Sequence, residues 1–235
     1  MKAIIFDVDD TLYDQLVPFQ RAIQQQFSIR DEQMAQLYLA FRQISDANFH
    51  ASERGVISME DMRVLRIQGA CEQFGYRVTR EQALAFQNDY ARFQGEIVLT
   101  EEMQEVLTLC IAHHIPIGVI TNGPTEHQWK KVHQLGLLRY IPKEYIFISA
   151  EVGVAKPDTS LFRHVEQQLG MAADQMIYVG DSYANDIVGA KNAGWQAIWL
   201  NRRQHVPTEA SARQDYLITT ESIVPLIKQI VGKLT

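Results

Sequence analysis

Hydrophobic residues follow two different patterns along the chain. The run Ala3–Phe6 is continuously apolar, which is typical of a short buried strand. From Gln15 to about Gly95 the apolar residues recur at helical spacing only, whereas from about Thr100 helical patterns alternate with short apolar runs. Strands separated by helices predict an α/β fold, with a doubly wound parallel (Rossmann-like) sheet and an inserted all-helical domain.

The second half of the chain sets the expected domain boundaries. It predicts strands at 115–120, 145–148, 176–179, 197–200 and 216–218, with a helix before each of the first four and a last helix from Ile223. The first strand has the same continuously apolar pattern, so we expect it in the same sheet. The helical segment is therefore an insertion into the α/β domain. We expect an α/β core formed by residues 1–14 and 96–235, and a helical domain formed by residues 15–95.

Within the helical segment, the pattern predicts helices over residues 16–27 and from residue 31 to about residue 45. Two further helices are expected to begin after Ser58 and Thr79, because both residue types cap helix N-termini. Gln82, three residues after Thr79, completes a capping box. Together these helices predict a small bundle.

Composition excludes several classes of protein. The net charge is −6, which argues against a broad nucleic-acid-binding surface. No apolar run approaches the ~20 residues that span a bilayer, and the short first run is followed at once by acids, so we expect neither a membrane segment nor a signal peptide. The two cysteines, Cys71 and Cys110, lie in apolar helical patterns and are expected to be buried thiols. We expect a cytoplasmic protein; the sequence does not predict its oligomeric state.

The first polar cluster directly follows the first strand. Asp7 and Asp9 are separated by Val8, and Asp10 and Thr11 come next. The carboxyl ends of parallel strands are where such sheets bind ligands, and two acids placed there repel each other unless a cation or a proton lies between them. One carboxylate can attack phosphorus while the second protonates the leaving oxygen. The alternative is that these acids form a turn or cap a helix.

Two more clusters occupy equivalent positions. Thr121, Asn122 and Gly123 follow a predicted strand, where a hydroxyl, an amide and backbone N–H groups can hold phosphate oxygens. An ordinary Asn-Gly turn is the alternative. Pro157 suits the first position of a helix, which would place Lys156 at a helix start, where a cation needs a nearby anion. The alternative is a solvated surface lysine.

The fourth cluster follows the strand predicted at 176–179. Asp181 lies at a carboxyl strand end, as Asp7 does, and Asp186 follows five residues later. Carboxylate oxygens from two strand ends suit Mg²⁺. Asp186 is also expected to cap the next helix, a role that is compatible with metal binding.

Taken in order, these clusters resemble the haloacid dehalogenase superfamily of phosphohydrolases. The resemblance covers the whole chain, and the helical insertion is similar to that family's type-1 helical cap. It implies that Asp7 is the nucleophile and a metal ligand, and that Asp9 is the general acid and base and gives its backbone carbonyl to the metal. The implied function is Mg²⁺-dependent hydrolysis of a small phosphorylated metabolite through an aspartyl-phosphate.

The same resemblance assigns the other residues. Thr121 and Asn122 are implied to bind the phosphoryl group, with Gly123 and Asp10 also placed in the substrate site. Lys156 is implied to neutralise the phosphoryl group and orient Asp7. The implied metal ligands are completed by Asp181 and by Asp186, which acts directly, through water or by holding Lys156.

The residues that are present or missing in this chain help to distinguish other activities of the superfamily. A dehalogenase typically lacks the second aspartate, which is present here as Asp9. Phosphonate cleavage needs a cap lysine, and residues 15–95 contain none. A sugar-phosphate mutase stays open, although mutases and phosphoglycolate phosphatases of the family usually carry glycine at the position of Asp10. A non-catalytic phosphate-binding module is a further alternative. The segment from Asp9 to Tyr13, Asp-Asp-Thr-Leu-Tyr, resembles the nucleotidases of the family, and this resemblance implies nucleoside monophosphates as substrates.

The polar segment 48–55 is expected to connect two helices of the cap. It carries aromatic and basic residues, and loops on rigid scaffolds often determine specificity. Our hypothesis is that it faces the substrate cleft; a solvated connection is the alternative.

Overall fold

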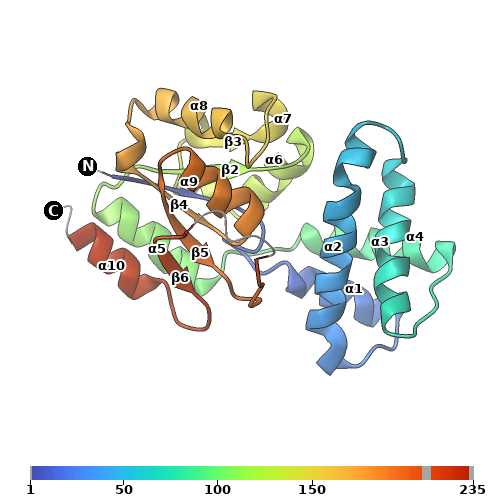
Figure 1. Cartoon of the computed structure of the whole chain (residues 1–235). Coiled ribbons are helices and arrows are strands. Elements are labelled where there is room, and N and C mark those ends of the chain that lie inside the picture. Colours follow the sequence, from blue (N-terminus) through green and yellow to red (C-terminus); the bar gives the residue numbers. More distant parts are fainter. Residues whose placement is uncertain (1, 208–212, 233–235) are drawn as a thin grey trace. The chain divides into compact units, whose positions relative to one another are not determined.

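The chain folds into two compact units (Figure 1). The computed structural model describes residues 2–207 and 213–232, apart from the side chains of residues 49, 50 and 53. The first unit contains the residues up to Asp14 and those from Val98 onward, and the second is Gln15–Ile97. The sequence placed these boundaries at residues 15 and 96. The role of the helical unit as a cap stays a prediction.

The described residues of the first unit form a six-stranded parallel sheet with the order β3-β2-β1-β4-β5-β6. The predicted α/β fold is therefore confirmed. β1 lies between β2 and β4, so that Ile5 pairs with Gly118 on one side and with Tyr178 on the other. The strands are β1 (Ala3–Phe6), β2 (Ile117–Thr121), β3 (Ile146–Ile148), β4 (Met176–Gly180), β5 (Gln196–Leu200) and β6 (Tyr216–Ile218).

Helices cover both faces of this sheet, which explains why its inner strands are apolar throughout. On one face, Phe162 of the covering layer packs edge-on against Tyr178 and Trp195. On the opposite face lie the first and last helices of the unit (Figure 1). The helices are α5 (Glu101–Ala112), α6 (Thr125–Gln134), α7 (Ser149–Val152), α8 (Thr159–Leu169), α9 (Val188–Asn192) and α10 (Val224–Gly232).

The strand order reverses at β1, because the chain continues to one side through β2 and β3 and to the other through β4, β5 and β6. The carboxyl end of a strand at such a switch point is the usual place for a ligand in a doubly wound sheet. Asp7 is the residue that follows β1. The fold thus places the first polar cluster at this point.

The second unit is a bundle with an aromatic core. Phe19 lies 5.0 Å from Phe41 and 5.6 Å from Phe86, measured between ring centroids, and Tyr90 stacks on Phe86. The side chains of Ser58 and Thr79 cap their helices as predicted, the latter in a full capping box. The helices are α1 (Leu16–Gln26), α2 (Met34–Glu53), α3 (Met59–Gln73) and α4 (Arg80–Gln94).

The predicted connection at 48–55 is wrong for most of its length. Helix α2 continues through Glu53, so only Arg54 and Gly55 of this segment lie beyond it. The polar residues after position 45 resemble a loop. In the structure, however, the side-chain amide of Asn48 donates a hydrogen bond to the Ile44 carbonyl at 2.7 Å. The first residue that strongly favours a helix end is Gly55, whose φ is +70°. The side chains of residues 49 and 50 lie outside the described part of the structure.

Among the described helices, none combines the length and the apolar character needed to cross a bilayer.

Candidate active site

Three aspartates that are far apart in the sequence meet beyond the carboxyl ends of β1 and β4. Asp7 follows β1, Asp181 follows β4, and Asp186 lies in the π-helical turn Tyr183–Ile187. One carboxylate oxygen from each lies within 4.8 Å of the others. Asp186 has no exposed surface and Asp7 has 5%. Buried carboxylates at this spacing repel each other strongly, so the group requires positive charge.

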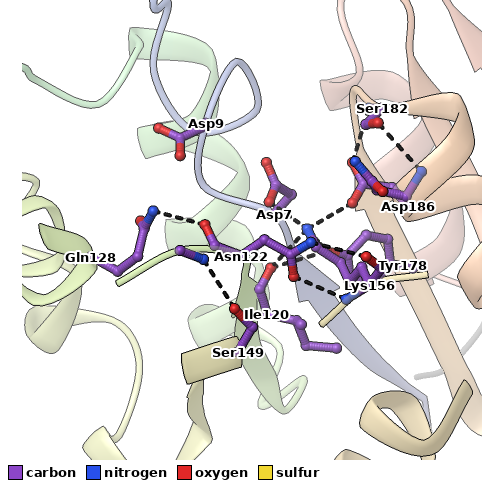
Figure 2. A network of polar contacts seen from close by, with 12 residues as sticks. Asp7, Asp9, Ile120, Asn122, Gln128, Ser149, Lys156, Tyr178, Ser182 and Asp186 are labelled. Atoms are coloured by element: carbon purple, nitrogen blue, oxygen red, sulfur yellow. Dashed lines mark hydrogen bonds and ion pairs between the residues drawn. The ribbon is translucent and has the colours of Figure 1, made fainter. Parts of the chain in front are cut away.

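Lys156 supplies part of that charge from within the same cluster (Figure 2). Its Nζ donates to Asp7 Oδ1 at 2.6 Å and to Asp186 Oδ1 at 2.7 Å. It also donates to the hydroxyl of Tyr178 at 2.9 Å and to the carbonyl of Ile120 at 3.2 Å. The lysine is buried, so the predicted alternative of a solvated surface lysine is wrong. The anion that a cation here needs is supplied by Asp7 and Asp186.

The electrostatics of the cluster leave excess negative charge. The pKa of Asp7 is raised to about 7, chiefly by burial; Lys156 opposes this shift, and Asp186 and Asp9 add to it. Burial also lowers the pKa of Lys156, but Asp186 and Asp7 more than compensate and raise it well above its ordinary value. The ammonium is therefore firmly charged, while ionised Asp7 is not fully stabilised.

Gly180 lets the Asp186 carboxylate pack against the end of β4. A Cβ at position 180 would overlap the carboxylate group of Asp186. Asp186 Oδ2 accepts a hydrogen bond from the backbone N–H of Ser182 at 2.9 Å. The predicted capping role of Asp186 is wrong, because the Ser182 side chain is the cap and accepts from the Asn185 N–H.

The residues after β2 are tied to the backbone of Lys156. Asn122 Oδ1 accepts from the Lys156 N–H at 2.9 Å, and Asn122 Nδ2 donates to the Lys156 carbonyl at 3.0 Å. Gly123 donates its N–H to Ser149 Oγ at 3.0 Å. Thr121 is buried, and its Oγ1 has no hydrogen-bond partner among the described residues. An unpaired buried hydroxyl on the residue between Ile120 and Asn122, both of which bind Lys156, is suited to bind an oxygen of a ligand.

The predicted helix start at Pro157 is wrong by two residues. Helix α8 begins at Thr159, and Asp158 is its N-cap, because its side chain accepts from the Ser160 N–H at 2.8 Å. Lys156 is held by Asn122 and by its carboxylate partners rather than by a helix start.

Asp9 has a different environment from Asp7. Lys131, on α6, donates its Nζ to both carboxylate oxygens of Asp9 at 2.7 Å. The Tyr13 hydroxyl donates to Asp9 Oδ1 at 2.5 Å. In Figure 2 the Asp9 carboxylate points away from the cluster of Asp7, Lys156 and Asp186. The two aspartates of the first motif thus bind different lysines.

Asp10 forms an ion pair with Arg203. The Arg203 guanidinium donates from Nη2 to Asp10 Oδ1 at 2.6 Å and from Nε to Asp10 Oδ2 at 3.2 Å. Its φ of +55° is a left-handed conformation that aspartate tolerates better than most residues. Asp10 and Arg203 line a cavity of about 240 Å³ together with Thr11 and Asp181. The substrate-binding role of Asp10 stays a prediction.

Sequence reasoning missed several residues of the site. Tyr178 lies inside an apolar run and gives no sign that its hydroxyl reaches Lys156. Lys131 is the second of two adjacent lysines on a predicted helix, and nothing local distinguishes it from Lys130, which is exposed. Arg203 follows the end of a predicted strand, and nothing near it in the sequence indicates its ion pair with Asp10. In each case the contact is set by the tertiary fold.

Comparison with known proteins gives a consistent family. A profile described as hydrolase, haloacid dehalogenase-like hydrolase, matches residues 1–194. YfnB of Bacillus subtilis strain 168, named as a HAD-hydrolase, is 24% identical over 85% of this chain and 84% of its own. Its magnesium-bound crystal structure has a TM-score of 0.71 at 22% identity, over 98% of each chain.

Two further proteins point to different chemistries. The pyrimidine 5'-nucleotidase YjjG of Escherichia coli K12 is 37% identical over 97 residues, which are 41% of this chain and 42% of YjjG. The crystal structure of the L-2-haloacid dehalogenase RSc1362 has a TM-score of 0.74 at 20% identity, over 99% of each chain. At these identities the structural matches show a shared fold.

Proposed function

This chain belongs to the haloacid dehalogenase-like hydrolases, and within that family we propose that it is a Mg²⁺-dependent phosphatase of small phosphate monoesters. The observation that carries the proposal is the buried cluster in which Lys156 bridges Asp7 and Asp186, with Asp181 beside them. Phosphoryl transfer depends mainly on charge neutralisation and in-line positioning. Charge neutralisation is supplied here by an ammonium and by a set of ligands for a cation. Positioning is supplied by the carboxylate that they hold in place.

The residues fit a divalent cation. Asp7, Asp181 and Asp186 offer carboxylate oxygens within 4.8 Å of one another, and Mg²⁺ prefers oxygen ligands. The fit is supported by the raised pKa of Asp7, because ionised Asp7 lacks enough positive charge nearby. YfnB, a relative, has been crystallised with magnesium. When bound, the cation would withdraw charge from the phosphoryl oxygens.

The remaining roles in the reaction are assigned to side chains and backbone groups of the protein. We assign Asp7 as the nucleophile that forms the aspartyl-phosphate, with Lys156 orienting it and neutralising the phosphoryl group. Thr121, whose Oγ1 is unpaired, and Asn122 and Gly123 are assigned to phosphoryl binding. Asp9 is assigned as the general acid and base, since it is the second carboxylate of the first motif, two residues after the nucleophile.

The runner-up function is dehalogenation, which is favoured by the fold shared with RSc1362. Such an enzyme needs neither a metal nor a second aspartate. The convergence of three carboxylates on one point, together with Asp9, favours the phosphatase. A mutase or a non-catalytic phosphate-binding module would keep the same cluster, and the assay below distinguishes them, because neither would release phosphate at an enzymatic rate.

The substrate proposed first is a nucleoside monophosphate. YjjG is named as a pyrimidine 5'-nucleotidase, and its matched segment is 37% identical to this chain. Sugar phosphates and other short organic phosphates are the comparison set. We propose a cytoplasmic enzyme without nucleic-acid or membrane partners, in keeping with the net charge of −6.

The test is phosphate release from a panel of phosphorylated metabolites and from p-nitrophenyl phosphate, with Mg²⁺ or with EDTA, ranked by kcat/KM. We expect activity that EDTA abolishes and that Asp7→Asn reduces by more than about 10³-fold. Asp174→Asn, at an exposed aspartate, is the matched control and should retain full activity. Halide release from a 2-haloacid without phosphate release, or substantial phosphatase activity in Asp7→Asn, would overturn the proposal.

A further inference from the structure

Lys131 is a buried lysine outside the cluster that holds Asp7. It is 4% exposed and projects from α6, the helix that follows Thr121 and Asn122 in the chain. Its Nζ donates to both oxygens of Asp9 at 2.7 Å, and within residues 2–207 and 213–232 these are its side-chain hydrogen bonds. A buried ammonium is costly without a counter-ion. The burial of Lys131 is therefore tied to Asp9.

The two aspartates of the first motif have separate counter-ions. Asp7 is bound by Lys156 at 2.6 Å, and Asp9 is bound by Lys131. Two carboxylates two residues apart would otherwise repel each other or share one cation. The two lysines approach from different elements, and in Figure 2 the Asp9 carboxylate points away from Asp7.

Tyr13 further restricts the orientation of the Asp9 carboxylate. Its hydroxyl donates to Asp9 Oδ1 at 2.5 Å, and the backbones of Asp9 and Tyr13 form an isolated bridge. Tyr13 is itself buried, so its ring has little freedom to move. A carboxylate held by an ammonium on both oxygens and by a phenol on one is restricted in direction.

We propose that Lys131 is a positioning residue for proton transfer by Asp9, an inference that rests on the proposed phosphatase function. In the first step an Asp7 oxygen bonds to phosphorus while the bond from phosphorus to the leaving oxygen breaks. Protonated Asp9 gives its proton to that oxygen, which departs as a neutral alcohol. Asp9 is left as a carboxylate, the form that Lys131 and Tyr13 bind in the structure. That carboxylate then takes a proton from the water that attacks the aspartyl-phosphate.

The test compares two leaving groups. An alkoxide needs a proton to depart, whereas p-nitrophenolate departs without one, and kcat/KM reports only the steps up to the first irreversible one. We expect Lys131→Met to lower kcat/KM by roughly 10²-fold for the best alkyl phosphate of the panel, and by less than about threefold for p-nitrophenyl phosphate. Lys131→Arg should restore part of the activity on the alkyl ester.

Lys130→Met is the matched control. Lys130 precedes Lys131 on α6, and its ion pair with Glu126 is solvent-exposed, so the same substitution there should leave both activities unchanged. Tyr13→Phe removes one hydroxyl from Asp9 and should show the same leaving-group dependence to a smaller degree. If Lys131→Met does not fold, the comparison is made with Lys131→Arg and Tyr13→Phe.

Equal losses of kcat/KM on both esters, or no loss on either, would refute the positioning role and leave the phosphatase proposal intact. Failure of the unaltered protein to hydrolyse either ester with Mg²⁺ would instead refute the phosphatase proposal, and the role of Lys131 with it.

Discussion

Lys156 Nζ lies 2.6 Å from Asp7 Oδ1, although the two residues are 149 positions apart in the sequence. The same ammonium contacts Asp186 at 2.7 Å, so one cation is shared between two buried carboxylates. Removing the ammonium would leave two buried carboxylates without a positive partner. Folding stability and the chemistry of the site therefore depend on the same atoms.

Lys156→Met should be strongly destabilising. It leaves Asp7 and Asp186 buried without their ammonium, and breaking a buried ion pair in this way costs about 3–5 kcal/mol. Lys228→Met breaks the exposed pair with Glu105 and should cost less than about 1 kcal/mol. Urea unfolding in EDTA measures both. Similar losses for the two variants would show that the cluster is not a buried charge network.

Asp7→Asn should stabilise the metal-free protein at neutral and mildly basic pH. Burial, opposed by Lys156, raises the pKa of Asp7 from 3.8 to about 7, so the ionised carboxylate is less stable in the folded than in the unfolded chain. Below the unfolded pKa the group is protonated in both states and this cost vanishes; it grows as pH rises from 3.8 and is complete above about 7. The gain in Tm should therefore be larger at about pH 8 than at about pH 5.

Thermal unfolding in EDTA measures this effect. The Tm should rise by about 2–4 °C for each kcal/mol of destabilisation that the substitution removes. Added Mg²⁺ should raise the Tm of the unaltered protein more than that of Asp7→Asn, because the cation supplies the charge that Asp7 lacks. A lower Tm for Asp7→Asn at both pH values would mean that Asp7 stabilises the fold.

The fold could be predicted from the sequence because its strands and helices have local causes. The apolar run Ala3–Phe6 and the capping box at Thr79 act through neighbouring residues, and both occur in the structure. The predicted end of α2 is wrong, since its residues after position 45 are mostly polar and resemble a loop, and only Ala47, Ala51 and Glu53 among them are strong helix formers. Propensity is a weak guide where a helix has an exposed face.

The site could be predicted only in part. Asp7 and Asp181 each follow a predicted strand, and a parallel sheet brings those strand ends to one edge. Lys156 and Asp186 are placed with them by the family resemblance, since the helix start expected at Pro157 and the cap expected at Asp186 do not occur. The contact between Lys131 and Asp9 has no local signal, because it depends on how α6 lies against the loop after β1. Side chains that meet through tertiary packing are not visible in a linear pattern.

The two thiols should be unreactive in the folded protein. Burial raises the pKa of Cys71 to about 11 and that of Cys110 to about 12, from 9.0 in each case. Thiols that ionise only when unfolded lower the free energy of unfolding as pH rises above about 9. We expect a thiol reagent to label both residues in urea and neither in buffer at neutral pH. The pH dependence should weaken in the Cys71→Ala, Cys110→Ala double variant; rapid labelling of the native protein would contradict the prediction.

Gly180→Ala tests whether the end of β4 must be glycine. The added methyl group would overlap the Asp186 carboxylate, which is fully buried and short, and so cannot move aside without losing Lys156 or the Ser182 N–H. We expect phosphatase activity to fall by at least about tenfold, with weaker Mg²⁺ dependence of Tm. Gly232→Ala, where the methyl group would meet no atom within 4 Å in the described structure, is the control and should leave both unchanged. Full activity in Gly180→Ala would mean that the position of Asp186 is not critical, and that its contact with Lys156 serves the fold alone.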